Sequence, residues 1–368
     1  MRIKNWLIVL LAAGVASCSS SSSDQGAERW KSGILVDEFI YLEDDVDFPS
    51  CHAATIEETP EGMVAAWFGG EYERHPEVCI YFSRLVDGEW TQPEMVADGV
   101  VSETERYATW NPVLYQVPGG DLQLYYKVGP NVAGWTGMMK TSGDHGKTWS
   151  EPIELPEGFL GPVKNRPVLL NDGRLLAASS TEGGRWRVHF EETRDFGQTW
   201  NKIGPINGGR EYAVIQPSIL VHNDSTLQIL CRSKNAVLAT SWSYDNGKTW
   251  SLIQPSGLPN NNSGTDAITL QDGRHLVVYN HVATAVNADK GYRTPLNVAL
   301  SDDGKNWKAA LILEDSEISQ YSYPSVMQSE DGMVHIVYTW RRDLIKYVKV
   351  DPTQLKLSSI HDEKWPLN

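Results

Sequence analysis

Basic residues are scarce in this chain of 368 residues. Lys and Arg together number 32, against 47 Asp and Glu, which gives a formal net charge of -15. A nucleic-acid-binding surface needs many cations to neutralise phosphates, so we expect no nucleic-acid partner. An acidic small ligand is not excluded, because a local cluster of arginines can override the net charge.

Cysteine is also rare, with four residues: Cys18, Cys51, Cys79 and Cys231. The three that follow Cys18 cannot pair completely, which argues against a disulfide framework. Cys79 and Cys231 lie in apolar runs and are predicted to be small core residues. The sequence contains no CxxC or HExxH motif, so we expect no metal site and no cofactor.

The chain has no apolar run long enough to span a membrane; residues 6–13, near the N-terminus, form a short one. Arg2 and Lys4 precede this run, and the combination is typical of a secretory signal. Val-Ala-Ser-Cys at 15–18 resembles the cleavage box of bacterial lipoproteins, which would make Cys18 the lipidated first residue. An ordinary soluble-export signal is the alternative.

These features divide the chain into three predicted parts. Residues 1–18 form a lipoprotein-type signal peptide, the Ser-rich residues 19–30 form a flexible tether, and residues 31–368 form one folded domain. We expect an exported protein, anchored to a membrane of the cell envelope through its lipid and facing the periplasm or the surface.

A short turn motif, Ser/Thr-x-Asp-x-Gly-x-Thr-Trp, recurs along the folded part. Clear copies occupy residues 142–149, 193–200 and 243–250. A weaker copy ends at Trp307, with Asp302 and Gly304 in the motif positions and Leu300 where Ser should stand, and a degenerate copy runs over 83–90. Copies lie roughly 50 residues apart, a period typical of blades or arrays. The Asp and Gly suit a tight turn, so we expect a structural role for them and no calcium site.

A second repeat is in phase with the first. Six Gly- or Asp-containing turns, each followed by an apolar strand, lie at 60–62, 118–120, 171–173, 223–225, 271–273 and 330–332. Two interleaved repeats predict an all-β protein, a six-bladed β-propeller of four-stranded blades, with one blade closed by joining the two chain ends. A β-sandwich is the alternative, but it does not explain the two repeats.

A third series precedes these hairpins and is marked by proline in five of its six members. If each member begins the innermost strand of a blade, the residues before these positions form a ring at one rim of the central channel: Phe48, Asn111, Arg166, Gln216, Asp266 and Tyr323. The strands after the hairpins should end at the same rim, and they carry Lys127, Glu182, Arg232, His281, Arg341 and Arg342. The sequence therefore predicts a charged ring where the six blades meet, a usual place for a binding site.

The recurring turns are what sialidases and their relatives call Asp boxes. With them, the chain resembles the bacterial sialidase-like (BNR-repeat) family over roughly residues 30–352. Members of that family bind a carboxylate with three arginines and attack with a tyrosine activated by a glutamate. The resemblance implies that Arg232 and Arg293 are the second and third arginines and that Tyr323 is the nucleophile. It makes Glu71 or Glu73 the acid on a mobile loop.

Two positions depart from the family pattern. Asp47 stands where the first arginine is expected, and Gln216 stands where the activating glutamate is expected. An amide cannot take a proton from a tyrosine hydroxyl, whose ordinary pKa is about 10. The implied fold is unaffected by these differences, whereas the implied mechanism loses two of its parts.

The residues themselves suggest further candidates. For catalysis these are His75, in the titratable 71–77 segment, and Asp266; for substrate binding they are Arg166, Lys127, Asn111, Trp110, His281 and Arg341. For each of them a structural role is the alternative: a surface ion pair, a turn cap or blade packing.

Three functions remain open from the sequence. The first is an exo-acting glycoside hydrolase on the terminal residue of an acidic glycan containing sialic or uronic acid, with a loop glutamate as acid and Tyr323 or Asp266 as nucleophile or base. The second is elimination next to a uronate carboxylate, a lyase or dehydratase reaction with Tyr323 or His75 moving the proton. The third is a non-catalytic glycan-binding lipoprotein. In each case the partner is an acidic oligosaccharide and the protein is expected to be a monomer.

Overall fold

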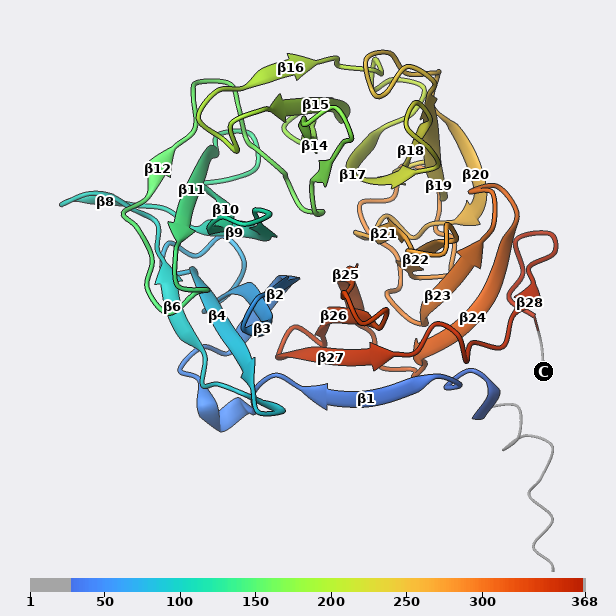
Figure 1. Ribbon diagram of the computed structural model, residues 1–368, viewed down its shortest axis with the longest axis horizontal. Helices are drawn as coiled ribbons and strands as arrows, with labels where there is room; N and C mark the ends of the chain where they lie inside the picture. The colour runs from blue at the N-terminus through green and yellow to red at the C-terminus, as the bar shows by residue number, and fades with distance from the viewer. Residues whose placement is uncertain (1–27, 367–368) are drawn as a thin grey trace, which may run out of the picture.

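The computed structural model describes residues 28–366. Six β-sheets stand side by side around a central channel (Figure 1), and helical structure within residues 28–366 is limited to residues 28–29 and a short 3-10 turn, Glu43–Asp45. The predicted six-bladed propeller with four-stranded blades is thus confirmed. Within the same residues, no helix has the length and apolar character needed to cross a membrane. Cys18, the predicted signal peptide and most of the predicted tether lie outside the described residues.

The blades follow the chain order, each running from its innermost strand outward. Blade 1 contains β2 (Ser50–Thr59), β3 (Gly62–Gly70), β4 (Cys79–Val86), β5 (Glu89–Trp90) and β6 (Glu94–Ala97). Blade 2 contains β9 (Thr109–Gln116), β10 (Leu122–Val128), β11 (Thr136–Ser142) and β12 (Ile153–Glu154). Blade 3 contains β13 (Val168–Leu169), β14 (Leu175–Thr181), β15 (Arg187–Thr193) and β16 (Asn201–Ile203).

Blade 4 contains β17 (Val214–Val221), β18 (Leu227–Ser233), β19 (Val237–Ser243) and β20 (Gln254–Pro259). Blade 5 contains β21 (Asp266–Thr269), β22 (His275–Tyr279), β23 (Leu296–Ser301), β24 (Trp307–Glu314) and the added β28 (Ser358–Ser359). Blade 6 contains β25 (Tyr321–Gln328), β26 (Val334–Trp340) and β27 (Leu344–Val350), and its outermost strand is β1 (Ile34–Phe39).

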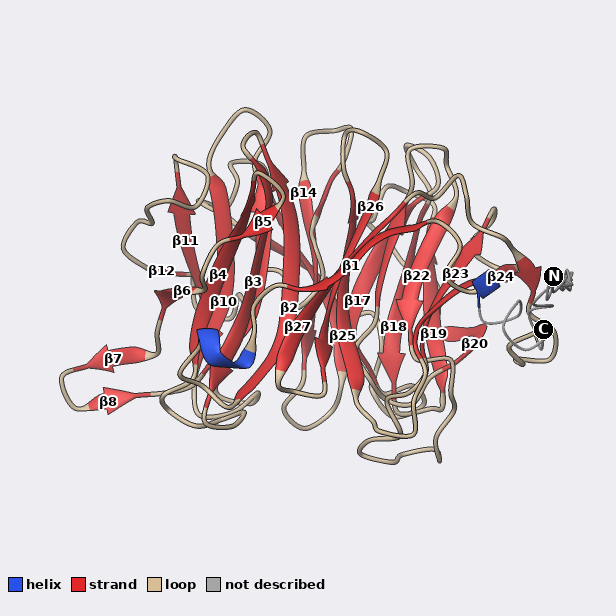
Figure 2. Cartoon of the chain, turned by 90° about the horizontal axis from the view of Figure 1, so that it is seen from below, coloured by secondary structure: helices blue, strands red, loops and turns tan. Residues whose placement is uncertain are grey.

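Strand β1 therefore closes the ring, as the repeat count predicted. It pairs antiparallel with β27, with Asp37 opposite Val348 (Figure 1). The two ends of the described chain hold one blade together, which leaves no open gap between the first and last blades. A small hairpin of β7 (Val100–Ser102) and β8 (Glu105–Arg106) projects from the side of blade 1 (Figure 2).

The Asp boxes close the ends of the third strands by local hydrogen bonds. In the copy after β15, the Asp195 carboxylate accepts from the hydroxyl groups of Thr193 and Thr199, at 2.8 and 2.6 Å, and from the Thr199 amide at 2.8 Å. These donors lower the pKa of Asp195 to about 2, although partial desolvation acts in the opposite direction. Asp144 and Asp245 are bound in the same way. The expected structural role of the boxes is confirmed.

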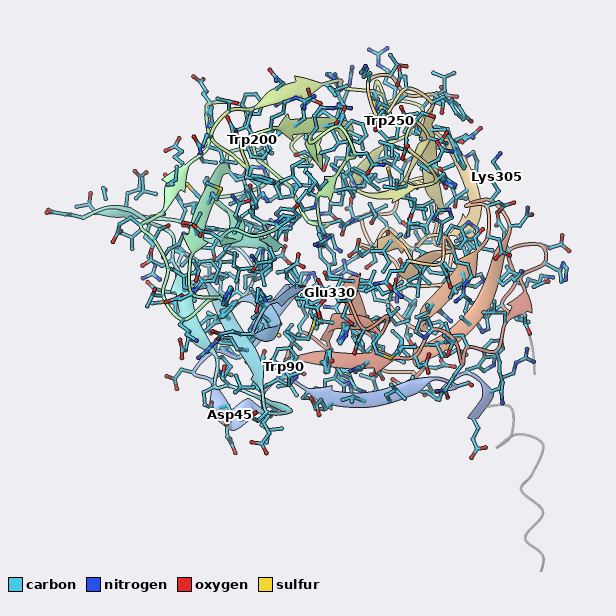
Figure 3. All side chains as sticks on the ribbon, viewed as in Figure 1. Asp45, Trp90, Trp200, Trp250, Lys305 and Glu330 are labelled. Atoms are coloured by element: carbon cyan, nitrogen blue, oxygen red, sulfur yellow. The ribbon has the colours of Figure 1, made fainter. Side chains whose placement is uncertain are left out.

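The box tryptophans pack between neighbouring blades. Trp250, from blade 4, stacks on Phe190 of blade 3, with ring centroids 4.3 Å apart, and Trp200 meets Tyr125 of blade 2 edge to face. In Figure 3, Trp200 and Trp250 lie in the outer part of the ring, away from its centre. The motif thus fixes how blades stack, and the chemistry lies elsewhere in the molecule.

The weak fourth copy was aligned one residue too early in the sequence prediction. The structure shows that Ser301 donates to Asp303 at 3.0 Å and that Asp303 accepts from the Asn306 amide at 2.7 Å, as in the other boxes. Asp302 instead pairs with Lys308. The turn is one residue shorter between its Asp and Trp307 than in the clear copies, which is why Asp302 and Leu300 were assigned to the wrong positions.

The predicted strand starts are correct in three blades, where β2, β13 and β21 begin at Ser50, Val168 and Asp266. They are wrong in the other three, where the proline lies at a bulge inside the innermost strand. Asn111, Gln216 and Tyr323 each precede a proline within a strand, have positive φ angles of 29°, 54° and 52°, and lie where the pairing register shifts. A residue with a Cβ rarely adopts this conformation. Such strained bulges re-aim side chains and occur next to functional sites.

Candidate active site in the channel

Tyr323 lies at the bulge of β25, and two side chains from another blade donate to its hydroxyl oxygen. Arg232, near the end of β18, donates from Nη1 at 2.5 Å, and the Gln216 amide, at the bulge of β17, donates at 3.4 Å. The ring of Tyr323 is 8 % exposed. Two donors directed at one hydroxyl oxygen stabilise negative charge on that oxygen.

Arg232 and Arg293 are buried without a carboxylate partner. Arg232 donates from Nε to Asn262 at 2.9 Å, and Arg293 donates to the Ser322 hydroxyl at 3.3 Å. Neither guanidinium forms an ion pair with any residue of the described chain. Burial, together with the positive charges of Arg232 and Arg342, lowers the pKa of Arg293 to about 10. Since buried charges are usually paired, these two arginines leave room for an anion from outside the protein.

His52, on β2, packs against Tyr323, and the charges around it include a third arginine, Arg342. Its ring lies 4.1 Å from the ring of Tyr323, centroid to centroid, and its Nδ1 is 2.9 Å from the Thr339 hydroxyl. Burial holds the pKa of His52 well below its usual range, and the charges of Arg342, Arg293, Arg232 and Lys164 lower it further. His52 is therefore neutral and is surrounded by cations.

Arg342 forms the outer side of this cluster. Its Nη1 contacts a carboxylate oxygen of Glu73 at 2.8 Å, so the acidic loop after β3 reaches the arginines. The absence of an arginine at position 47 is thus partly compensated, because Arg342 brings a third guanidinium from blade 6. Asp47 itself is exposed.

Glu182 is connected to Tyr323 through one intervening side chain, that of Gln216. It follows β14, and its Oε1 accepts from the Gln216 amide nitrogen at 3.1 Å and from Ser180 at 3.3 Å. Gln216 thus bridges a carboxylate and the tyrosine hydroxyl, and its own Oε1 is buried without a partner in the described chain. Burial raises the pKa of Glu182, and the positive charge of Arg232 partly offsets this.

The side of the site next to Arg232 is aromatic. The guanidinium of Arg232 lies 5.2 Å from the ring of Trp186, and the Lys234 ammonium lies 4.5 Å from the same ring. Trp186 belongs to the loop between β14 and β15 that also carries Glu182. An indole beside a cation offers a surface on which a sugar ring can stack.

Both carboxylate oxygens of Asp266 accept hydrogen bonds from within the protein. One oxygen accepts from Ser218 at 2.8 Å and from the Ala267 amide at 2.9 Å, and the other accepts from the Val326 amide at 3.0 Å. Burial raises its pKa, and the nearby Lys164 opposes the rise. Asp266 therefore links blades 4, 5 and 6 by hydrogen bonds. The structure does not support the catalytic role that the sequence suggested for it.

The titratable residues of the loop after β3 differ in their contacts. Glu73 reaches Arg342, whereas Glu71 is exposed and forms no hydrogen bond or ion pair within residues 28–366. His75 accepts from the Glu77 amide through Nδ1 at 3.2 Å and meets the ring of Tyr72 edge to face. Of the three predicted catalytic residues in this loop, Glu73 is the one brought to the arginine cluster.

Four predicted substrate-binding residues have partners inside the protein instead. Arg166 forms a two-point ion pair with Glu57, with contacts of 2.6 and 3.1 Å. Lys127 is fully buried and donates to the Pro162 carbonyl. Asn111 donates to the Val163 carbonyl at 3.2 Å, and Trp110 donates to the Gly129 carbonyl at 2.9 Å. Arg166 thus joins blades 1 and 3, Lys127 and Asn111 hold the segment between blades 2 and 3, and Trp110 is bonded within blade 2. The structure therefore does not support placing these residues against a substrate.

The remaining two predictions differ in outcome. His281 contacts the Tyr279 hydroxyl at 2.5 Å and the Glu363 carbonyl at 2.9 Å, and burial lowers its pKa to about 4. Arg341 lies over the ring of Trp340 at 4.2 Å, its Nε is buried without an acceptor, and its guanidinium forms no ion pair within the described chain. His281 holds the C-terminal segment, and neither residue contacts Tyr323.

Sequence reasoning did not select four residues of this site: His52, Glu182, Trp186 and Arg342. Glu182 and Arg342 belong to the predicted ring of strand ends, and that membership was the available signal. His52 and Trp186 gave no such signal, because their proximity to Tyr323 and Arg232 depends on the packing of distant blades. Within residues 28–366, no group of three or more His, Cys, Asp or Glu side chains is arranged to hold a metal ion.

Comparison with known proteins agrees with this geometry at the level of the fold. A protein of unknown function from Dyadobacter fermentans is 16% identical over 86% of this chain and 99% of its own, with a TM-score of 0.69. The NanB sialidase of Streptococcus pneumoniae is 13% identical over 87% of this chain and 71% of its own, with a TM-score of 0.66. An α-L-arabinanase of Penicillium chrysogenum is 17% identical over 88% of this chain and 99% of its own, with a TM-score of 0.65.

The sequence has no significant match among curated proteins. A family profile described as the BNR repeat-like domain matches residues 61–336, which is most of the propeller. The Asp boxes, the six blades and this match lead to one conclusion: the chain belongs to the BNR repeat-like domain family, with a fold shared by sialidases and an arabinanase.

Proposed function

We propose that the protein is a glycoside hydrolase acting on the terminal residue of an acidic glycan, at the channel site around Tyr323. The observation that carries this proposal is the buried pair Arg232 and Arg293, which no carboxylate of the described chain neutralises. A sugar carboxylate is a fitting partner, because guanidinium groups bind carboxylates in a two-point geometry. Arg342 adds a third donor on the rim.

Tyr323 is the proposed nucleophile. Its hydroxyl oxygen already accepts hydrogen bonds from Arg232 and Gln216, which orient it for attack on the anomeric carbon. Glu182 supplies the nearest negative charge, linked to the tyrosine through the Gln216 amide. The Gln216 amide donates to both groups and can neither take nor relay the proton. We therefore assign the basic role to Glu182, which would receive the Tyr323 proton directly or through one water.

Glu73 is the proposed acid. It is half-buried and lies on the loop after β3, and its contact with Arg342 keeps it at the edge of the arginine cluster. An acid at this edge can protonate the departing sugar oxygen, while the carboxylate of the terminal residue is held by Arg232 and Arg293.

Elimination at the same site is the second candidate, and one observation favours it. No carboxylate of the described chain contacts the Tyr323 hydroxyl, whereas neutral His52 and two donors surround the tyrosine. A tyrosine in such surroundings can remove a proton next to a uronate carboxylate while the arginines stabilise the resulting charge. The substituent on the neighbouring carbon then leaves with its oxygen.

We also propose that the protein is exported and lipid-anchored through Cys18, on the strength of the sequence at 15–18. Metabolic labelling with a palmitate analogue tests this in cells of an organism that processes lipoproteins. Label on the wild type and its loss in Cys18→Ser support the anchor. Equal labelling of both proteins contradicts it.

Product masses distinguish the two reactions. Purified residues 24–368 are incubated with sialylated and uronic-acid oligosaccharides, with Tyr323→Phe as the control, and the products are read by mass spectrometry. Cleavage with the gain of one water supports hydrolysis. Cleavage without added water supports elimination, and no change with any substrate contradicts both reactions.

A further inference from the structure

The loop between β14 and β15 has two faces, and only one of them belongs to the Tyr323 site. Glu182 and Trp186 turn toward Gln216 and Arg232. The alternate residues Thr181, Gly183 and Arg185, with Arg187 at the start of β15, line a separate pocket of about 410 Å³.

This second pocket is cationic. Arg185, Arg187, His189 and Lys202 line it together with Thr181, Gly183 and Pro205, and none of these residues is acidic. Such a concentration of positive charge is unexpected on a chain with a net charge of -15. Local basic clusters of this kind attract anionic ligands.

The two arginines of the pocket have no partner in the described chain. Neither guanidinium forms a hydrogen bond or an ion pair there, and the Nε of Arg187 is buried without an acceptor. An unsatisfied buried donor destabilises the folded protein, so an acceptor from a ligand would remove that penalty. This orphaned nitrogen is the second observation, independent of the charge, that points to a ligand.

The other two cations are already held in place. Glu191 is fully buried under the pocket, where it contacts His189 at 2.8 Å and Lys202 at 3.4 Å and accepts from the Gly161 amide at 2.6 Å. The Glu191 carboxylate is therefore already paired with His189 and Lys202. Arg185 and Arg187 remain uncompensated, and they set the charge that a ligand would meet.

Neighbouring hollows extend the pocket along the rim. A hollow of about 330 Å³ shares Thr181 and Gly183 with it and is lined by Trp135 and Phe159, beside Glu154 and Glu157. Another, of about 710 Å³, shares Arg185 and Arg187 and also contains Tyr212 and Glu211. A run of hollows with aromatic walls and a cationic centre suits a chain of sugars, whose rings stack on aromatic faces.

We propose that this pocket binds a second anionic group, a sulfate or a carboxylate, on another sugar of the glycan whose acidic residue is held at Tyr323. The glycan would then be polyanionic, with one acidic residue at Arg232 and Arg293 and another at Arg185 and Arg187. The proposal rests on the proposed function for the first contact only, since the pocket and its unpartnered arginines exist whether or not Tyr323 is catalytic.

The test is a binding measurement that needs no turnover. Calorimetric titration of Tyr323→Phe protein uses three tetrasaccharides: a heparin fragment with sulfates and carboxylates, a hyaluronan fragment with carboxylates only, and neutral chitotetraose. We expect binding of at least one anionic probe, weakened about tenfold or more by Arg185→Gln with Arg187→Gln. Preference for the heparin fragment identifies sulfate, and equal binding of both anionic fragments identifies carboxylate.

A matched control removes two charges at the other end of the blades. Arg194→Gln with Lys248→Gln alters exposed cations beside the Asp boxes, and affinity should stay within about twofold. Equal loss in both double variants would mean non-specific attraction and would overturn the proposal, as would unchanged affinity in the pocket variant or no binding of either anionic probe. Arg185→Gln alone, at an exposed position, serves if the double variant does not fold.

A last variant separates this proposal from the proposed function. If Arg232→Gln leaves affinity unchanged while the pocket variant loses it, the pocket stands and the carboxylate clamp at Tyr323 fails. If Arg232→Gln lowers affinity and the pocket variant does not, the clamp stands and the second anion site is overturned.

Discussion

The two ends of the blades are made from the same strands but satisfy their polar groups differently. At the Asp-box end, each carboxylate is bound by its own turn; Asp195, for example, accepts from Thr193 and Thr199. At the channel site, Arg232 and Arg293 are buried without a carboxylate, and Gln216 and Tyr323 have positive φ angles. The first end is locally complete, whereas the second is stable only because the whole ring supports it, as expected where a protein keeps strain for function.

The largest expected difference between the two ends is in catalysis. Tyr323→Phe removes one oxygen from the channel site, and we expect kcat to fall by about 10³-fold or more because the proposed nucleophile is lost. The free energy of unfolding should change little, since the ring of Tyr323 keeps its packing. Steady-state rates together with chemical denaturation measure both quantities. Full activity in this variant would remove Tyr323 from the mechanism.

Glu182 gives the second prediction, through pH. Because burial raises the pKa of Glu182, its carboxylate is lost at a higher pH than an ordinary glutamate would lose it. The rate should therefore fall as the pH drops through this raised pKa. Glu182→Gln should lower kcat by about 10²-fold and remove that acidic limb of the pH–rate profile. A variant with a lower rate but the same acidic limb would leave Glu182 a structural role only.

Arg293 tests the cost of function directly. Arg293→Met replaces an unpaired buried charge by an apolar chain, so the free energy of unfolding should rise by about 1 kcal/mol while kcat/KM falls by about 10²-fold. Thermal unfolding and kinetics on one preparation measure the two changes. A destabilised variant would show that the contacts of Arg293 with the protein outweigh its unpaired charge.

The contrast between the two ends also explains what could be predicted from sequence. A turn such as residues 243–250 satisfies Asp245 by contacts at most four residues away, so the motif alone reveals the structure. Tyr323 and Arg232 were selected because they occupy repeat positions and also match functional residues of the sialidase-like family. Glu182 was not selected as a site residue, because its link to Gln216 crosses from blade 3 to blade 4.

Contacts between residues far apart in the sequence also made one selected residue a wrong choice. Arg166 was expected to face a substrate, but its partner Glu57 lies 109 positions earlier in the chain, on another blade. Arg342, which was not selected, reaches Glu73 across 269 positions. Periodicity predicts which end of a blade a residue occupies, and it contains no information on which neighbour neutralises the residue.

At the Asp-box end, a substitution should affect stability alone. Asp195→Ala removes the acceptor for four hydrogen bonds of a turn that positions Trp200 between blades, and we expect a loss of about 2 kcal/mol in the free energy of unfolding. The kcat of the folded protein should stay within about twofold of the wild type. A large loss of kcat at full folding would show that the two ends are coupled.

Lys127 gives the smallest expected effect and tests whether an unpaired charge is costly away from the proposed catalytic groups. Burial lowers the pKa of Lys127 from 10.5 to about 7, so the folded protein loses this proton at a lower pH than the unfolded chain does. The unfolded state then binds more protons between about pH 7 and 10.5, and the contribution of Lys127 to stability rises with pH across that window. Below pH 7 the folded protein carries the full cost of the buried charge.

Lys127→Met should therefore stabilise the protein by about 1 kcal/mol at pH 6.5, with a smaller or no gain at pH 9, because the Pro162 carbonyl loses its donor at every pH. Urea unfolding at the two pH values measures the difference, with Lys248→Met, an exposed lysine at the Asp-box end, as the control that should show no pH-dependent gain. An equal gain at both pH values would mean that the pKa of Lys127 is the same in the folded and the unfolded state, so that burial of this lysine carries no pH-dependent cost.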